Sequence, residues 1–266
     1  MTADMSERQC NIHGNGCQKR HLAGAGTWPG YSLTRPPPDV TILLAMQRLR
    51  VKFRRGAELK FISHLDIMRL WVRALRRARV PLVYSEGFSP HPRISLAAPL
   101  SVGITGEGEF MDVTVSRPVS PHWFMNAVNG QLPHGIEVLE VYPIAPTVPS
   151  LQSQVRYAHY LVEVATTKPE EEIKADIRRL LSLEHLPWHH ERDTGRRDYD
   201  LRALIDDISV GGCHDGTCVL EMRLRCDESG SGRPEQVVYA LGFNERPKSV
   251  QRTRLVLGAR RQDSRN

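Results

Sequence analysis

Residues 84–103, YSEGFSPHPRISLAAPLSVG, combine an apolar run with acidic, basic and hydroxyl side chains. Pro90 and Pro92 each fix their own backbone and bias the residue before them toward an extended conformation. We therefore expect His91 and Arg93 to be displayed with little conformational freedom. Because a guanidinium group matches phosphate oxygens and an imidazole can exchange protons, this segment predicts an anion-facing loop with acid–base potential. The alternative is a turn between two strands.

The segment FISHLDIMRLWVRALRRARV (61–80) shows helical spacing, and Ser63 precedes Asp66 by three residues, as in a capping box. The predicted apolar face holds Leu65, Met68, Trp71, Val72 and Leu75. Four arginines occupy an arc of about 100° opposite that face. They are Arg69, Arg73, Arg76 and Arg77. Arginines stay charged and bind phosphate bidentately, so this stripe predicts contact with a nucleic-acid backbone. The alternative is a solvated outer helix face.

Two histidines are candidates for catalysis. His64 and Asp66 begin the predicted helix, and a sheet edge could bring them beside His91 and Arg93 in one polar patch. Two histidines can serve as general acid and base, whereas a metal site needs a third ligand at a fixed spacing. We therefore expect anion binding rather than a metal here, with His64 and His91 as the catalytic candidates if the protein is an enzyme. The alternative is that His64 is only a first-turn helix residue.

The cysteines indicate neither a disulfide framework nor a zinc site. Their number, five, is odd, and the chain is long enough to bury its own core. Cys213, His214, Cys218 and Cys226 lack the paired spacing of zinc ligands, and Cys213 and Cys218 are expected to flank a hairpin turn. The glycine-rich GITGEGE (103–109) lacks the Lys-Ser/Thr of a phosphate loop. We expect no metal and no cofactor.

The net charge of +6 is unevenly distributed. Residues 46–100 carry twelve Lys and Arg against three acidic residues, a net charge of +9, and residues 101–150 carry one Arg against five acidic residues. This asymmetry suggests one face for an anionic ligand rather than a generally basic surface.

A second basic group could extend that face into the second half of the chain. It comprises Arg197, Arg202, Arg252 and Arg254. The alternative is a set of cross-strand ion pairs, each contributing little free energy.

Composition places the protein among soluble globular proteins. The chain has 266 residues, of which 40% are hydrophobic and 25% charged. No apolar run approaches the ~18 residues of a membrane helix, and the beginning of the chain lacks a signal-peptide pattern. We expect a cytoplasmic protein without membrane contact.

Residues 1–45 are rich in Gly, Pro and small polar residues and show no periodicity, so we expect a disordered extension. Met46 stands directly before the first periodic segment, so the extension could also reflect a mis-assigned translation start. Residues 260–266 are expected to form a tail.

The periodic segments follow the same order twice: strand, helix, strand, strand, helix, strand. In the first half they lie at 48–55, 63–80, 82–84 with 94–100, 109–115, 120–133 and 135–144. In the second half they lie at 157–166, 168–182, 199–210, 217–226, 233–242 and 252–259. This order predicts an α+β fold of two tandem ferredoxin-like βαββαβ units with antiparallel sheets, at 46–146 and 147–259. The proline-containing stretch 142–150 is the expected seam.

Residues 47–257 resemble the radical SAM-linked protein family, a bacterial domain of unknown function. The resemblance rests on the block from FISHLD to PHPRISLAAPLSVG (61–103) and, more sparsely, on RRDYDLRALI (196–205) and RTRL (252–255). It implies a radical SAM protein as partner and an accessory role in RNA or ribosome maturation. The family has no established catalytic residues, and this chain lacks the CxxxCxxC pattern of a radical SAM cluster.

Three functions are therefore open. The first is a module that binds RNA or another anion beside the radical SAM partner, with Arg69, Arg73, Arg76, Arg77, His91 and Arg93 as its contacts. The second is a protein-only adaptor that docks on that partner. The third is a metal-independent enzyme that processes or modifies RNA.

Overall fold

Alternation of apolar and basic side chains builds the first strand, β1 (Gln47–Arg55), as predicted. The computed structural model describes residues 46–192 and 195–258, so the expectations for residues 1–45 and 260–266 concern parts of the chain outside these ranges. Leu49, Val51 and Phe53 of β1 are buried on one face of a sheet. The basic residues between them point to the other face.

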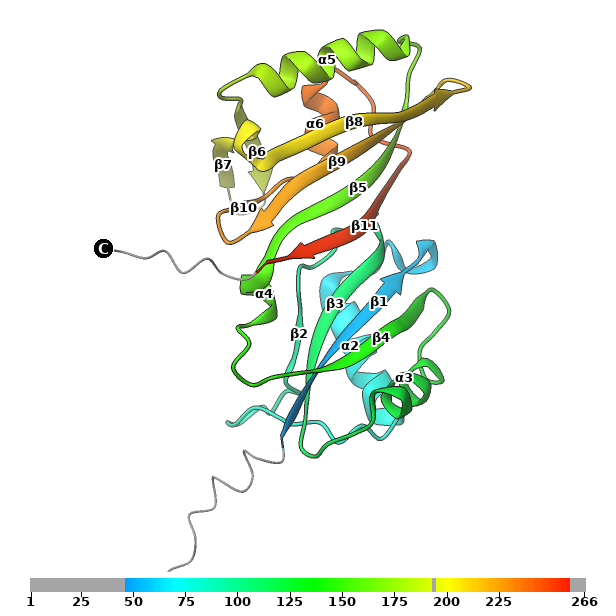
Figure 1. Ribbon diagram of the computed structural model, residues 1–266, viewed down its shortest axis with the longest axis vertical. Coiled ribbons are helices and arrows are strands. Elements are labelled where there is room, and N and C mark those ends of the chain that lie inside the picture. The colour runs from blue at the N-terminus through cyan, green and yellow to red at the C-terminus, as the bar shows by residue number, and fades with distance from the viewer. Residues whose placement is uncertain (1–45, 193–194, 259–266) are drawn as a thin grey trace, which may run out of the picture. The chain divides into compact units, whose positions relative to one another are not determined.

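The first half follows the predicted order of elements. It contains β1, η1 (Ala57–Leu59), α2 (His64–Arg77), β2 (Ile94–Leu96), β3 (Thr105–Val115), α3 (Pro121–Asn129) and β4 (Ile136–Ile144). The strands pair in the order β4-β1-β3-β2, and each pairing is antiparallel. Trp71 of α2 packs edge-to-face on Phe53 of β1, with ring centroids 5.0 Å apart, and Phe124 of α3 joins the same core. Figure 1 shows both helices beside this part of the sheet.

The predicted apolar face of α2 is partly wrong. Ile67, Trp71, Ala74 and Leu75 are the buried residues, whereas Leu65 is 65% exposed. Leu65 lies two positions from Ile67, which is about 200° around a helix, so the two side chains cannot face the same sheet.

Ion pairs cover the other face of β1. Arg50 donates two hydrogen bonds to Asp112 of β3, at 2.8 and 3.1 Å, and both side chains are about 5% exposed. Farther along the strand, Lys52 pairs with Glu140 of β4. The acidic segment 101–150 therefore neutralises much of the positive charge of β1. The basic residues that remain available lie mainly outside β1.

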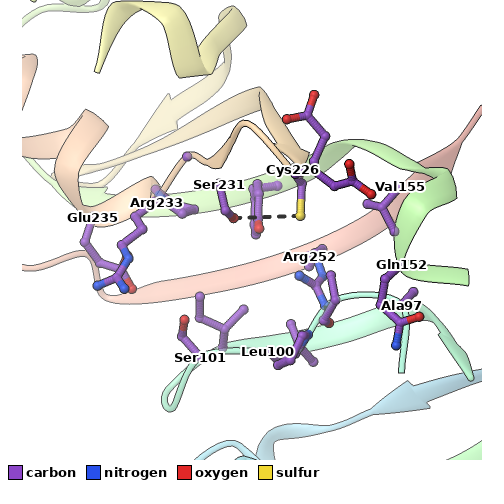
Figure 2. A pocket seen from close by; sticks show the side chains of 18 residues that line it. Ala97, Leu100, Ser101, Gln152, Val155, Cys226, Ser231, Arg233, Glu235 and Arg252 are labelled. Atoms are coloured by element: carbon purple, nitrogen blue, oxygen red, sulfur yellow. Dashed lines mark hydrogen bonds between the residues drawn. The ribbon is translucent and has the colours of Figure 1, made fainter. Parts of the chain in front are cut away.

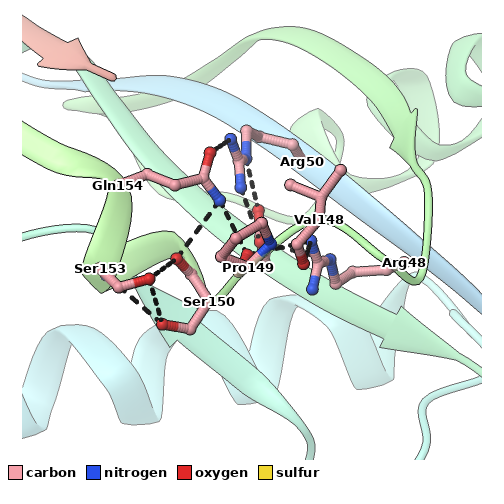
Figure 3. Close-up of polar contacts among 8 residues, drawn as sticks. Arg48, Arg50, Val148, Pro149, Ser150, Ser153 and Gln154 are labelled. Carbon is pink, nitrogen blue, oxygen red and sulfur yellow. Dashed lines mark hydrogen bonds and ion pairs between the residues drawn. The ribbon is translucent and has the colours of Figure 1, made fainter. Parts of the chain in front are cut away.

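The predicted seam is anchored to this same face, as Figure 3 shows. Arg48 donates to the carbonyl oxygens of Val148 and Pro149, and Arg50 donates to the side-chain oxygen of Gln154. Gln154 in turn donates to the Pro149 carbonyl at 2.8 Å. The connection between the halves is thus held by basic side chains of β1.

The second half repeats the order with additions. It contains α4 (Leu151–Gln154), β5 (Val155–Ala165), α5 (Glu170–Ser182), β6 (Pro187–Arg192), β7 (Gly195–Asp200), η2 (Arg202–Leu204), β8 (Ile205–His214), β9 (Thr217–Asp227), β10 (Gly230–Ser231), α6 (Pro234–Ala240) and β11 (Ser249–Leu257). The main strands pair antiparallel in the order β11-β5-β9-β8, and β10 adds to β9. A second hydrophobic core lies between these strands and α5 and α6.

The single strand predicted at 199–210 is wrong. Its first residues belong to the hairpin β6-β7, which the sequence did not predict, and a 3-10 turn then separates them from β8. The Asp200 carboxylate accepts hydrogen bonds from the backbone N–H groups of Leu186 and Arg202. Those bonds provide acceptors for two backbone N–H groups at the turn where β7 ends.

The cysteine pattern indicated no disulfide, and this interpretation is wrong for one pair. Asp215 and Gly216 both have positive φ and form a tight turn between β8 and β9, which places Cys213 opposite Cys218. A disulfide joins this pair, and Cys226 is a buried free thiol. The hairpin register brings the two sulfurs together, which the odd cysteine count did not indicate.

The two halves share one sheet of nine strands within the described residues. The short β2 covers only one end of the β3 edge, and β11 pairs in parallel at the other end, with Gln251 opposite Thr105. The structure confirms an α+β fold with a mostly antiparallel sheet (Figure 1). Among the described residues, no helix is long and apolar enough to cross a membrane.

Candidate anion-binding surface

The start of α2 follows the predicted cap. The Ser63 hydroxyl oxygen accepts a hydrogen bond from the Asp66 N–H and donates one to the Asp66 carboxylate at 2.7 Å. Asp66 also pairs with Arg69 at 2.9 Å. Hydrogen bonds from Ser63 and Arg69 lower the pKa of the Asp66 carboxyl. Asp66 is therefore a capping residue whose carboxylate is a weaker base than usual, with its oxygens already bonded to Ser63 and Arg69.

The predicted arginine stripe is exposed along α2. Arg69, Arg73, Arg76 and Arg77 all lie on the solvent side of the helix. Arg73 donates to the backbone carbonyl of Arg69 at 3.3 Å. Within the described part of the chain, no carboxylate forms an ion pair with Arg73, Arg76 or Arg77, so these guanidinium groups are available to a ligand.

Arg76 joins the helix to the proline-braced segment. Its Nε donates to the Tyr84 hydroxyl at 3.1 Å, and its guanidinium lies 5.6 Å from the centre of the Tyr84 ring. Cation–π contact of this kind holds a guanidinium in place without neutralising it. The last turns of α2 and the beginning of residues 84–93 therefore meet at one surface.

Backbone hydrogen bonds brace the segment itself. Ser85 and His91 face each other through an N–H to carbonyl bond of 2.8 Å and a bond from the His91 N–H to the Ser85 hydroxyl. Arg93 donates its N–H to the carbonyl of Val83. Gly87 at the tip has a φ of 112°, which side-chain-bearing residues rarely adopt. His91 and Arg93 are both exposed, on a backbone fixed at both ends.

His64 lies at the other end of the helix. Twelve residues separate it from Arg76, which corresponds to about 18 Å along a helix axis. Because Arg76 contacts Tyr84, the structure places His91 and Arg93 with the C-terminal arginines rather than with His64 and Asp66. Arg76 contacts the 84–93 segment directly, and His64 lies at the opposite end of α2 from that contact.

Arg79 is a further exposed arginine directly after α2, and the sequence patterns did not identify it as a candidate. Arg79 follows α2, is exposed and has a φ of 56°, in the left-handed region. Its N–H donates to the Arg76 carbonyl, and the next residue, Val80, donates to Leu75. Glycine is the usual residue at such a helix end because an L side chain costs free energy there. A strained arginine at this position favours the hypothesis that its charge binds a ligand.

Replacing Arg79 by glycine is expected to stabilise the fold and weaken anion binding. Relief of the left-handed strain should raise the free energy of unfolding by about 0.5–1 kcal/mol. Loss of one cation should lower the affinity for RNA. Urea unfolding and a titration with a labelled oligoribonucleotide measure the two effects. A variant that is more stable yet binds RNA as tightly as the wild type would assign Arg79 to the fold alone.

Two alternatives were open for the second basic group, and the structure favours internal contacts for Arg252 and Arg202. Arg252 is buried, where it pairs with both oxygens of Glu109 and donates to the Ala98 carbonyl. Arg202 donates to the backbone carbonyls of Leu181 and Ile205. Arg254 is exposed, and the side chain of Arg197 lies outside the described part of the structure. The guanidinium groups of Arg252 and Arg202 therefore serve as hydrogen-bond donors to backbone carbonyls within the fold. Spacing in the sequence does not identify those acceptors.

A cavity of about 440 Å³ borders the buried Arg252, as Figure 2 shows. Burial raises the pKa of the Cys226 thiol and raises that of the Tyr160 hydroxyl to about 12. Both groups therefore stay protonated at neutral pH and are not activated for nucleophilic or base catalysis. Among the described residues, no group of three or more His, Cys, Asp or Glu could hold a metal ion.

Comparison with solved structures gives distant similarities of fold. A Cbf5–Nop10–Gar1 complex matches with a TM-score of 0.43 and 10% identity over 79% of this chain and 48% of that chain. The archaeal box H/ACA sRNP Nop10–Cbf5 complex matches with a TM-score of 0.41 and 9% identity over 84% and 50%. The chain thus spans about half the length of these structures. No curated protein matches it.

A family model covers the part of the chain that builds both the arginine surface and most strands of the second half. It matches residues 48–234, and its description is "Uncharacterized protein conserved in bacteria (DUF2344)". The chain therefore belongs to this bacterial family.

Proposed function

We propose that the protein is an accessory RNA-binding module that works in the cytoplasm with a radical SAM enzyme, in RNA or ribosome maturation. The observation that carries the RNA-binding part is the α2 surface, defined by Arg69, Arg73, Arg76, Arg77, Arg79, His91 and Arg93. Apart from Arg69, which pairs with Asp66, the arginines of α2 have no carboxylate partner among the described residues. Exposed guanidinium groups of this kind suit the phosphate backbone, which contributes most of the non-specific affinity for nucleic acids. The radical SAM partner is implied by the resemblance of residues 47–257 to the radical SAM-linked family.

We further propose that each half is a ferredoxin-like unit, at 46–146 and 147–259. The strand orders β4-β1-β3-β2 and β11-β5-β9-β8 support this, because both place the four main strands of a βαββαβ unit in the same antiparallel arrangement. The separate hydrophobic cores of the two halves support it as well.

A salt titration of the purified protein tests RNA binding. For single-stranded RNA, the logarithm of the association constant should fall linearly with the logarithm of salt concentration, with a slope of about −0.7 per phosphate contacted. Contacts from four arginines would give a slope of about −3. Fluorescence anisotropy of a labelled oligoribonucleotide measures it. A salt-insensitive interaction, or no interaction at low salt, would contradict the proposal.

A protein-only adaptor is the second candidate function. Phe88, at the tip of the 84–93 segment, is fully exposed, and exposed aromatic side chains are common anchors in protein interfaces. Nuclease treatment separates the two candidates: co-purification with the radical SAM protein that survives nuclease and depends on Phe88 would favour the adaptor.

A further inference from the structure

A second cavity lies away from the exposed arginines of α2 and has different chemistry. Its volume is about 670 Å³, and three aromatic residues line it: Phe61, Trp188 and Tyr239. Phe61 is 72% exposed and Tyr239 is 39% exposed, although a monomer usually buries such side chains. They come from different parts of the chain: Phe61 precedes α2, Trp188 lies on β6 and Tyr239 lies on α6.

The charges around this cavity favour an anion. The basic lining residues are Lys60, Arg233, Arg246 and Lys248, against the single acidic residue Glu235. The first cavity differs, because Arg233 and Arg252 there face Asp227, Glu228 and Glu235, and Arg252 is already paired. Of these two cavities, the second therefore combines aromatic surfaces with an excess of positive charge.

One wall of the cavity is built rigidly. The Gly103 N–H donates to the Lys60 carbonyl at 2.7 Å, which ties the two loops of this wall together. Behind them, buried Arg55 donates to the carbonyls of Ser101 and Ile104 at 3.2 and 2.8 Å. Gly103 itself has a φ of 90°, a backbone conformation that favours glycine. A preformed wall lowers the conformational entropy that the protein itself must lose when a ligand binds.

We propose that this groove binds a nucleotide, with its base stacked on Phe61 or Tyr239 and its phosphate bound by Arg246 and Lys248. Grooves that hold unpaired nucleotides combine aromatic side chains with cations in this way, because every base offers a face for stacking. The inference goes beyond the α2 surface, since it assigns a second site to other residues. The nucleotide can come from an RNA strand or from a free mononucleotide.

Phe61→Ala tests the stacking contact with two probes: a fluorescent oligouridylate of about eight nucleotides, and UMP. Stacking of one base contributes about 1–3 kcal/mol, so the affinity for the oligouridylate should fall about tenfold or more. Phe61→Tyr should retain it. Trp123→Ala is the matched control, because Trp123 is an exposed aromatic residue on α3 that does not line this groove. Circular dichroism checks that each variant is folded.

The two probes distinguish the sources of the nucleotide. Phe61-dependent binding of UMP alone would support a free nucleotide, and Phe61-dependent binding of the oligouridylate alone would support a nucleotide within RNA. Equal affinity of wild type and Phe61→Ala for both probes, or no binding of either probe, would overturn the inference.

The charge-reversal variant Arg73→Glu/Arg76→Glu separates this site from the proposed function. If it loses the oligouridylate while Phe61→Ala binds both probes as tightly as the wild type, the groove inference fails and the α2 surface stands. If only Phe61→Ala loses binding, the groove stands and the α2 proposal fails.

Discussion

Arg252→Met is expected to lower the free energy of unfolding by about 3–5 kcal/mol, because it leaves the Glu109 carboxylate buried without its main partner. Both side chains are 3% exposed. Burial alone would lower the pKa of Arg252, but the charge of Glu109 raises it above the usual value for arginine. This ion pair also connects β11 to β3, so its loss weakens the junction between the halves.

Arg254→Met is the matched control for that prediction. Arg254 lies on the same strand and is exposed, so its replacement should change the stability by about 0.5 kcal/mol or less. Urea unfolding followed by circular dichroism measures both variants. The double variant Arg252→Met/Glu109→Gln should be less destabilised than the two single changes added together, because it removes both charges. Similar stabilities of Arg252→Met and Arg254→Met would show that the buried pair contributes little.

Arg73→Glu/Arg76→Glu is expected to lower the affinity for RNA by about two orders of magnitude. A hydrogen bond to a charged group contributes about 1.5–3 kcal/mol, so loss of two phosphate contacts removes about 3 kcal/mol or more. Both side chains are exposed, and neither has a carboxylate partner among the described residues, so the fold should tolerate the change. Anisotropy titration at fixed salt concentration measures the affinity.

Arg178→Glu/Arg254→Glu changes the net charge equally and is the matched control. Both of these arginines are exposed in the second half, outside the α2 surface. If the control loses as much affinity as Arg73→Glu/Arg76→Glu, binding follows net charge alone and the α2 surface has no special role.

Local patterns predicted the elements that carry them. The Ser63 and Asp66 spacing predicted the start of α2, and apolar alternation predicted β1 and β9. The hairpin β6-β7 escaped prediction because PWHHER (187–192) is mainly polar and shows no apolar alternation.

Long-range partners could not be predicted in the same way. Arg252 and Arg254 are two residues apart and should share a face of a regular strand. A bulge between them pairs Arg252 with Tyr160 and Arg254 with the adjacent His159, so one is buried and the other exposed. Similarly, the acidic partner of Arg50 lies 62 residues away, and only the sheet register identifies it.

The α2 surface combines a feature that a local pattern predicted with contacts that depend on long-range structure. The arginine stripe followed from helical spacing, but its contact with Tyr84 and the addition of Arg79 depend on how the chain leaves the helix. The groove beside Phe61 depends on residues from both halves, which no local pattern brings together.

Crosslinking of RNA to the protein in living cells tests the central claim most directly. Wild type, Arg73→Glu/Arg76→Glu and Arg178→Glu/Arg254→Glu would be compared at equal protein levels after ultraviolet irradiation. The α2 surface predicts RNA on the wild type and the control variant and a strong loss on Arg73→Glu/Arg76→Glu. Equal recovery of RNA from all three proteins, or none from the wild type, would contradict it.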